Sequence, residues 1–136
     1  RYVRDRTVSH AIRQAYAAAG IGVTDLDFAE VHDCFTPAEL LIYEAMGLTP
    51  RGQGVRAIED GTVMADGRTP VNLSGGLKAK GHPVGATGVS MHALAFRQLT
   101  GQAGDMQRKG AEWGLTFNMG GAAVANYATV LQAVGI

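Results

Sequence analysis

The stretch Asn72-Leu-Ser-Gly-Gly-Leu-Lys-Ala-Lys-Gly-His-Pro-Val-Gly-Ala-Thr-Gly88 is the most informative part of this chain. It places His82 in a loop that carries five glycines, just before an apolar run typical of a helix. Glycine lets the backbone approach a ligand closely, and a helix start presents unpaired N–H groups. A histidine in such a loop is placed to stabilise an oxyanion or to move a proton. The spacing alone fits a glycine-rich turn with an incidental surface histidine equally well.

Composition limits the classes of protein to consider. A chain of 136 residues can bury the core of one domain. Twelve basic and twelve acidic residues balance, which predicts no nucleic-acid or membrane-surface partner. No apolar run reaches the length of a membrane span, and the charged N-terminal residues lack a signal-peptide core. The one cysteine, Cys34, excludes an internal disulfide and fits a reducing compartment, so we expect a cytoplasmic protein.

The first half of the chain predicts a helix, a strand and a second helix. Asp5 or Thr7 is expected to cap the first helix, and Gly20 to end it. Residues 28–31 are short and β-prone, which predicts a strand. Thr36 is then expected to cap a helix that ends at Gly47, with a proline at its first position.

The second half predicts a sheet and one buried helix. Residues 49–68 are expected to form a loop with one helical turn near 55–59, and residues 70–73 a strand. The helix after His82 should run to about Leu99, and its apolar residues on all sides predict burial all round. Residues 113–118 and 122–131 favour an antiparallel pair, with a tight turn at 119–121. The alternation of helices and strands predicts an α/β fold.

Three sequence blocks resemble the thiolase superfamily. The first is Asn-x-x-Gly-Gly followed by Gly-His-Pro-x-Gly-x-Thr-Gly, within residues 72–88. The second is Glu-Val-His-Asp-Cys-Phe, residues 30–35, which is closest to the version found in sterol-carrier-protein-type thiolases. The third is Asn-Met-Gly-Gly-Ala, residues 118–122, where ordinary thiolases carry a Cys-x-Gly motif. The blocks occur in the family's order, and the resemblance extends from about residue 7 to residue 132.

The resemblance implies the C-terminal half of the thiolase fold and an acyl-CoA acyltransferase activity. The fold would be α/β, with a mixed sheet, a buried helix after the Gly-His-Pro loop and helices on the outer face. The activity would be the formation or thiolytic cleavage of carbon–carbon bonds in 3-ketoacyl-CoA, in lipid or sterol metabolism. Coenzyme A thioesters would be substrates, with no resident cofactor and no metal.

The implied catalytic residues are Cys34, His82 and His32. Cys34 would move a proton, and His82 would bind the thioester oxygen and activate a nucleophilic cysteine. The resemblance extends to six implied substrate-binding residues: Asn72, Gly75, Gly76, Gly81, Asn118 and Gly120. From the residues alone, Cys34 is equally a small buried hydrophobe, and His32 a strand histidine bonded to the backbone. Asp33 is expected to orient the corner.

Two departures from the family pattern limit the activity of this chain. Asn118 stands where a catalytic cysteine is expected, although Cys34 would replace that cysteine. The acyl-accepting cysteine, which thiolases carry in their N-terminal half, has no counterpart here. We therefore expect residues 1–136 to be a thiolase C-terminal-like domain, either a fragment or a subunit of a homo- or hetero-oligomer. A retro-aldolase for steroid side-chain CoA esters and a non-catalytic module that binds acyl-CoA or a partner are the alternatives.

Two further expectations concern packing. In a strand, His32 and Cys34 would point to the same side, because side chains alternate along a strand. Phe35 is expected to belong to the core, since it is a large apolar residue between a strand and a helix.

Overall fold

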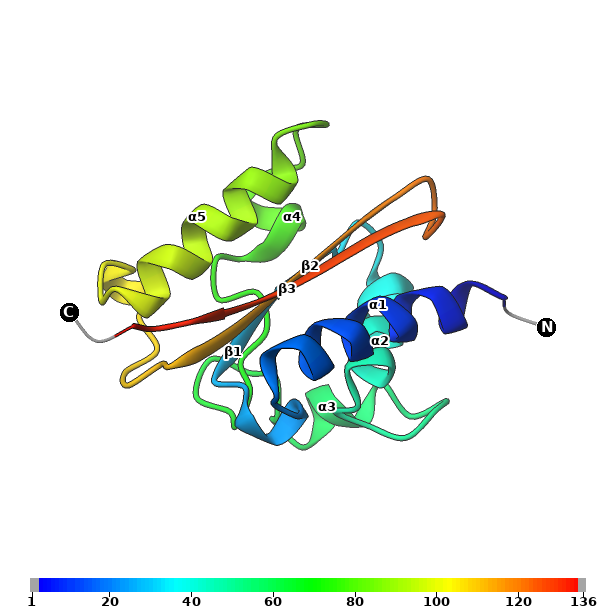
Figure 1. The fold of residues 1–136 in the computed structure, drawn as a ribbon, viewed down its shortest axis with the longest axis horizontal. Coiled ribbons are helices and arrows are strands. Elements are labelled where there is room, and N and C mark those ends of the chain that lie inside the picture. Colours follow the sequence, from blue (N-terminus) through cyan, green and yellow to red (C-terminus); the bar gives the residue numbers. More distant parts are fainter. Residues whose placement is uncertain (1–2, 135–136) are drawn as a thin grey trace.

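The computed structural model describes residues 3–134 of the chain, with side chains from residue 7 onward. Helices and strands alternate along the sequence and build three layers (Figure 1). The elements are α1 (Val3–Ala19), β1 (Phe28–Val31), α2 (Thr36–Met46), α3 (Arg56–Glu59), α4 (Gly76–Lys80), α5 (Thr87–Leu99), β2 (Trp113–Gly120) and β3 (Ala125–Gln132), with short 3-10 turns at 23–25 and 104–106. This is the mixed α/β architecture that the sequence predicts.

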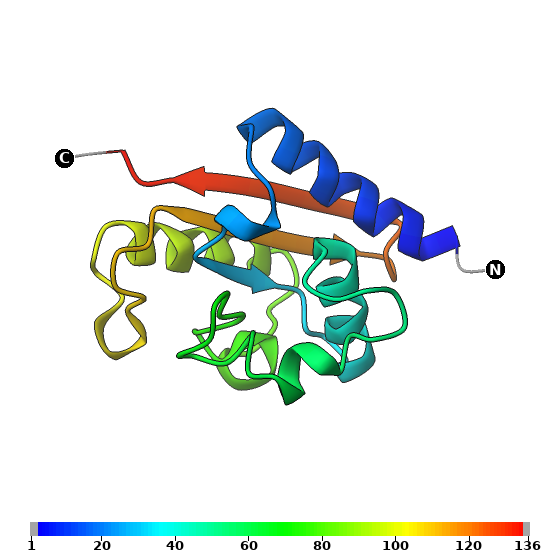
Figure 2. The same cartoon turned by 90° about the horizontal axis from the view of Figure 1, so that it is seen from below.

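A three-stranded mixed sheet in the order β1-β2-β3 forms the middle layer. β1 runs parallel to β2, with Val31 opposite Phe117, and β2 runs antiparallel to β3. Helices α1 and α2 cover one face of the sheet, and α5 lies along the other (Figures 1 and 2). The carboxyl ends of the parallel strands β1 and β2 therefore lie at one edge of the sheet.

The hydrophobic core lies between the sheet and the helices α1 and α2. Leu115 and Phe117, which alternate along β2, contribute to it from the sheet and are fully buried. Ile12 of α1 and Ile42 of α2 pack against the same cluster. Burying each such side chain stabilises the fold by roughly 1.5–3 kcal/mol. This core fixes β1 and β2, and so the position of the residues that follow them.

Several expected elements are confirmed. The strand at residues 28–31, the helical turn at 56–59 and the end of α5 at Leu99 are found as predicted. A bridge between Val71 and Ala29 stands in place of the strand expected at 70–73. The hairpin turn lies at residues 121–124 instead of 119–121, because β2 extends to Gly120.

The N-terminal helix caps differ from the predictions, whereas Gly47 ends α2 as predicted. Asp5 and Thr7 both lie inside α1 instead of capping it. The hydroxyl of Thr7 donates to the carbonyl of Ala123 at 3.3 Å. Phe35 caps α2 and Thr36 is its first residue, so the prediction of a threonine cap is wrong. The extended backbone of Phe35 turns the chain into the helix without any side-chain hydrogen bond.

Two predictions of burial are also wrong. Helix α5 is buried on one side only: Met91 and Ala95 are fully buried, whereas Val89 is 73% exposed and Phe96 58% exposed. Phe35 is 73% exposed and outside the core. In both cases the sequence supplies apolar side chains for which residues 3–134 provide no covering layer.

No helix within residues 3–134 is long and apolar enough to cross a membrane.

Candidate functional site

The candidate site lies where β1 and β2 end side by side. Because Val31 is opposite Phe117, the next residues, His32 and Asn118, are neighbours across the two strands. Nδ1 of His32 lies 2.6 Å from Oδ1 of Asn118. A carbonyl oxygen only accepts, so His32 carries a proton on Nδ1 and donates it to Asn118. Parallel pairing of two short strands thus positions the first histidine.

His82 completes a pair of histidines. Its ring lies 4.9 Å from the ring of His32, between centroids, in an edge-to-face arrangement with an interplanar angle of 89°. Nδ1 of His82 lies 2.6 Å from the hydroxyl oxygen of Thr87, at the start of α5. Whereas His82 is exposed, His32 behind it is only 5% exposed. Among the described residues, neither Nε2 atom has a hydrogen-bond partner.

Burial controls the charge of His32. Removal from solvent lowers its pKa below the ordinary 6.5, and the nearby His82 lowers it further. The hydrogen bond to Asn118 and the charge of Asp33 act in the opposite direction but are smaller. His32 is therefore neutral at pH 7, with a lone pair on Nε2 that can accept a proton or a hydrogen bond.

The segment that precedes His82 is held by carboxylates from β1 and the following corner. Glu30 accepts hydrogen bonds from the hydroxyl of Ser74 at 2.5 Å and from its N–H at 3.2 Å. Asp33 accepts the N–H of Leu77 at 2.7 Å. Glu30 is 2% exposed, and burial raises its pKa, whereas the bonds to Ser74 and the charge of Lys80 lower it. These bonds connect both sides of the corner to the glycine-rich loop.

Four of the implied substrate-binding residues have structural contacts or conformations of their own. Asn72 accepts the N–H of Val31 through Oδ1 at 2.8 Å and donates through Nδ2 to Glu39 at 3.1 Å. Gly75 and Gly76 both have positive φ, and a Cβ on Gly76 would collide with the carboxylate of Asp33. Gly81 also has positive φ, at 96°, with open space around it.

The remaining two implied substrate-binding residues differ from each other. Asn118 uses its side-chain oxygen for His32, and its amide nitrogen lies 3.1 Å from where a Cβ on Gly88 would be. Gly120 is exposed at the end of β2, with open space around it. Their contact with a substrate remains a proposal.

Cys34 lies in the corner between β1 and α2 and is half-buried, with a free thiol. The strand ends at Val31, and a hydrogen bond of 3.1 Å from the N–H of Asp33 to the carbonyl of Val31 turns the chain there. The expectation that His32 and Cys34 share a strand face is therefore wrong. Among the described residues, no hydrogen bond or ring contact joins Cys34 to His82.

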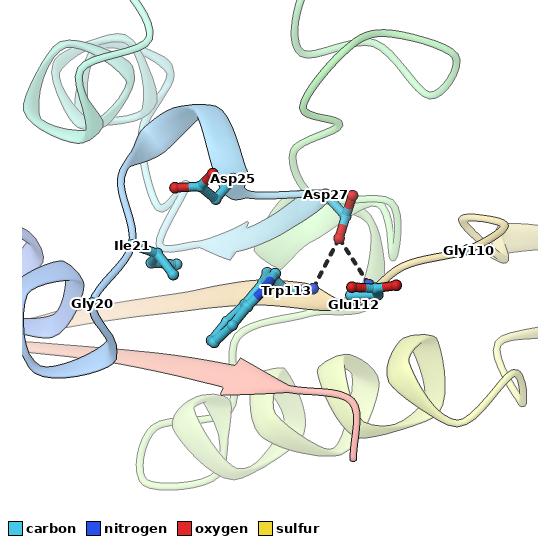
Figure 3. A pocket seen from close by; sticks show the side chains of 7 residues that line it. All are labelled: Gly20, Ile21, Asp25, Asp27, Gly110, Glu112 and Trp113. Atoms are coloured by element: carbon cyan, nitrogen blue, oxygen red, sulfur yellow. Dashed lines mark hydrogen bonds between the residues drawn. The ribbon is translucent and has the colours of Figure 1, made fainter. Parts of the chain in front are cut away.

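Open hollows occur elsewhere on the surface. One of about 440 Å³ lies beside Asp27 and Trp113, where Asp27 accepts the N–H groups of Glu112 and Trp113 (Figure 3). Another of about 750 Å³ lies between α1 and the turn after β2. Neither is lined by His32, His82 or Cys34.

Thr87, Glu30 and Ser74 are contacts of the site that sequence reasoning missed. Thr87 could have been predicted from its place in Gly-His-Pro-x-Gly-x-Thr-Gly, five residues after the histidine. Ser74 also stands inside the glycine-rich block. Glu30 opens the His-Asp-Cys-Phe block, but nothing in that block indicates that a strand carboxylate reaches across to a loop.

Comparison with known proteins agrees with this fold and this arrangement of motifs. The family model described as "Thiolase C-terminal domain-like" matches residues 3–133. The chain therefore belongs to the thiolase C-terminal domain-like family.

Two curated relatives are similar to most of this chain. The chain is 50% identical over 117 residues to an acetyl-CoA acetyltransferase of Methanothermobacter thermautotrophicus, a match that covers 86% of this chain and 30% of the relative. It is 47% identical over 116 residues to sterol carrier protein 2 of Rattus norvegicus, covering 84% of this chain and 21% of the relative. The chain thus spans less than a third of the length of these relatives.

A solved structure shares the fold. It is an Ltp2–ChsH2(DUF35) aldolase, with a TM-score of 0.80 and 27% sequence identity. The match covers 93% of this chain and 31% of that one.

Proposed function

We propose that this chain is the C-terminal catalytic part of an acyl-CoA acyltransferase of the thiolase type. The observation that carries the proposal is the pairing of His32 with His82 at the end of β1 and β2, beside the corner that bears Cys34. The identity of 50% to an acetyl-CoA acetyltransferase supports it. The acyl group would be carried as a coenzyme A thioester.

The proposed reaction joins two acyl groups next to a thioester. The thiolate of Cys34 takes a proton from the α-carbon of an acyl-CoA, and the electron pair left behind moves onto the thioester oxygen as an enolate. His82, and His32 behind it, stabilise that oxygen once an Nε2 atom carries a proton. The enolate carbon then attacks an acyl group held on a second cysteine, which leaves as a thiolate. Thiolytic cleavage is the reverse sequence.

The second cysteine must come from outside these 136 residues, because Cys34 is the chain's single cysteine. Exposed apolar side chains on α5 support the proposal that another layer covers this helix: Val89 is 73% exposed and Phe96 58% exposed. Large exposed apolar patches mark interaction surfaces. We propose that the missing N-terminal thiolase half covers this face, from the same or another chain, and that the assembly is a homo- or hetero-oligomer.

A chimera tests the acyltransferase proposal. In it this chain replaces the matching part of the Methanothermobacter relative, which supplies the remaining length of the enzyme. We expect the chimera to cleave 3-ketoacyl-CoA with free coenzyme A, and the isolated chain to show no turnover. Turnover by the isolated chain, or a folded chimera that is inactive on 3-ketoacyl-CoA, would contradict the proposal.

A retro-aldolase acting on steroid side-chain CoA esters is the second candidate, favoured by the structural similarity to an aldolase. The presence of Cys34 and His82 supports acyl transfer instead, because aldolase-like members of the thiolase superfamily tend to lack both residues. The two candidates differ in substrate. Cleavage of a 3-hydroxyacyl-CoA without added coenzyme A would favour the aldolase, and binding of acyl-CoA without any cleavage would favour a non-catalytic module.

A further inference from the structure

We infer that Thr87 is a positioning residue that holds His82 with its proton on Nδ1, so that Nε2 is the proton acceptor of the resting site. The catalytic consequence rests on the proposed function, whereas the position of the proton does not. Thr87 is 3% exposed and is the first residue of α5, so its hydroxyl is anchored in the body of the domain. His82 is exposed and gains a fixed orientation from this contact.

The direction of the hydrogen bond follows from the number of hydrogens available. The Thr87 hydroxyl lies 2.6 Å from Nδ1 of His82 and 3.1 Å from the carbonyl oxygen of Pro83. A hydroxyl has one hydrogen, and a carbonyl oxygen only accepts. Both bonds form together only if Nδ1–H donates to the hydroxyl, which in turn donates to Pro83.

The reverse arrangement leaves the site less well satisfied. If the hydroxyl donated to Nδ1, the carbonyl of Pro83 would still receive the N–H groups of Ala86 and Thr87. The buried hydroxyl oxygen of Thr87 would then accept no hydrogen bond from His82, and the proton of the ring would lie on Nε2. The reverse arrangement therefore makes one hydrogen bond fewer, because the 3.1 Å contact between the Thr87 hydroxyl and the Pro83 carbonyl carries no hydrogen, and the chain His82 to Thr87 to Pro83 is the favoured one.

The contact with Thr87 opposes the intrinsic preference of the ring. A neutral histidine side chain in water carries its proton mainly on Nε2, and the partner of one ring nitrogen determines which nitrogen is protonated. With the proton on Nδ1, the exposed ring of His82 presents a basic Nε2 atom. That atom can take the proton of a thiol, and the resulting imidazolium can then donate to a thioester oxygen.

His32 also carries its proton on Nδ1, but its hydrogen-bond partner is an amide instead of a hydroxyl. Its Nδ1–H donates to Asn118, and Gly88, the second residue of α5, leaves room for the Asn118 amide, which lies 3.1 Å from where a Cβ would be. The first turn of α5 therefore influences both histidines, and both Nε2 atoms are acceptors in the neutral site. The site as a whole is prepared to receive a proton before it donates one.

The test measures the position of the proton directly. The full chain is labelled with ¹⁵N-histidine and examined by NMR at a pH where all imidazoles are neutral, and the His82 signals are assigned with H82Q. We expect a pyrrole-like shift for Nδ1 of His82 and a pyridine-like shift for Nε2. The variant T87V should reverse the pattern toward Nε2–H, and T87S, which keeps the hydroxyl, should retain it.

T69V is the matched control. The hydroxyl of Thr69 is buried and, within the described part of the chain, has no hydrogen-bond partner, so its removal should leave the His82 shifts unchanged. A wild-type His82 with its proton on Nε2, or a folded T87V variant that keeps Nδ1–H, would overturn the inference. If T87V does not fold, the wild-type and T87S spectra still decide the question. Because the readout is spectroscopic, its result is independent of whether the chain supports acyl transfer.

Discussion

The rings of His32 and His82 meet edge to face at 4.9 Å, although fifty positions of sequence separate the two residues. Nδ1 of His32 is hydrogen-bonded to Asn118, and Nδ1 of His82 is hydrogen-bonded to Thr87. The buried ring of His32 lies behind the exposed ring of His82, and neither Nε2 atom has a hydrogen-bond partner among the described residues. This relationship is the basis of the predictions that concern chemistry.

Replacing His82 should slow carbon–carbon bond chemistry more than any other single change in the loop. In the chimera with the Methanothermobacter relative, we expect H82A to lower the rate by at least on the order of a hundredfold, the usual cost of losing one oxyanion donor. Steady-state kinetics with 3-ketoacyl-CoA measures the effect. His10, which is exposed on α1, is the control, and H10A should have nearly wild-type kinetics. Similar losses in both variants would contradict the assignment.

Cys34 should be required for the reaction but not for the fold. We expect C34A in the chimera to abolish cleavage of 3-ketoacyl-CoA, because no other group of this chain is assigned to move the α-proton. Circular dichroism and the midpoint of thermal unfolding should remain close to wild type, since the thiol is only half-buried. Cys34 is the single cysteine, so a thiol reagent applied to the isolated chain reports on it alone. A thiol that stays unreactive in the native chain would favour a structural role.

His32 should make the chain less stable in mild acid. Its pKa is lowered in the folded state, so the unfolded chain binds a proton first as the pH falls below about 6.5. The stability that the neutral ring contributes is therefore present above that pH and is lost as the pH falls through the folded pKa. Urea unfolding between pH 7 and 5 should show a steeper loss for wild type than for H32Q. Equal slopes would show that His32 titrates normally.

The same argument predicts a coupling between the two histidines. H82A removes a like charge and exposes His32, and both effects should raise the pKa of His32, which NMR titration measures. An unchanged pKa would mean that the ring contact is absent in solution.

Gly76 should tolerate no side chain. G76A adds a Cβ that collides with the carboxylate of Asp33 and forces a non-glycine residue to adopt a φ of 64°. The control is G20A, which has a φ of 71° and open space around it, so that backbone strain acts alone. We expect G20A to cost about 1 kcal/mol in the free energy of unfolding and G76A clearly more, since strain and collision add. Equal costs would show that Asp33 moves aside freely.

The exposed face of α5 should drive association of the isolated chain. We expect the wild-type chain to form oligomers or bind an apolar dye, and the double variant V89S/F96S to do so less, because both side chains are exposed on that face. Analytical ultracentrifugation measures the oligomeric state. L41S is the control, since Leu41 is 51% exposed on α2, on the opposite side of the sheet. A monodisperse wild-type monomer that binds no dye would contradict the prediction.

Local sequence patterns predicted most of the helices and strands and the helix that follows the His82 loop. Short-range rules are enough for this: β-prone residues 28–31 form β1, and the glycines around His82 lead into α5. The alternating pattern of helices and strands also gave the α/β class. The sequence predicted the C-terminal Gly47 of α2 but not the N-terminal cap, because Phe35 takes the extended position before α2 without any side-chain bond.

Long-range packing determines which residues meet and which side chains are covered. The parallel register of β1 and β2 brings Asn118 to His32, and the carboxylates of Glu30 and Asp33 hold the glycine-rich loop that leads to His82. No local pattern encodes such long-range pairing. Burial is decided in the same way: an apolar residue such as Phe96 is buried only if another layer covers it, and residues 3–134 supply a layer on one side of α5 alone. Periodicity reports what a helix could bury, whereas the packed structure shows what it does bury.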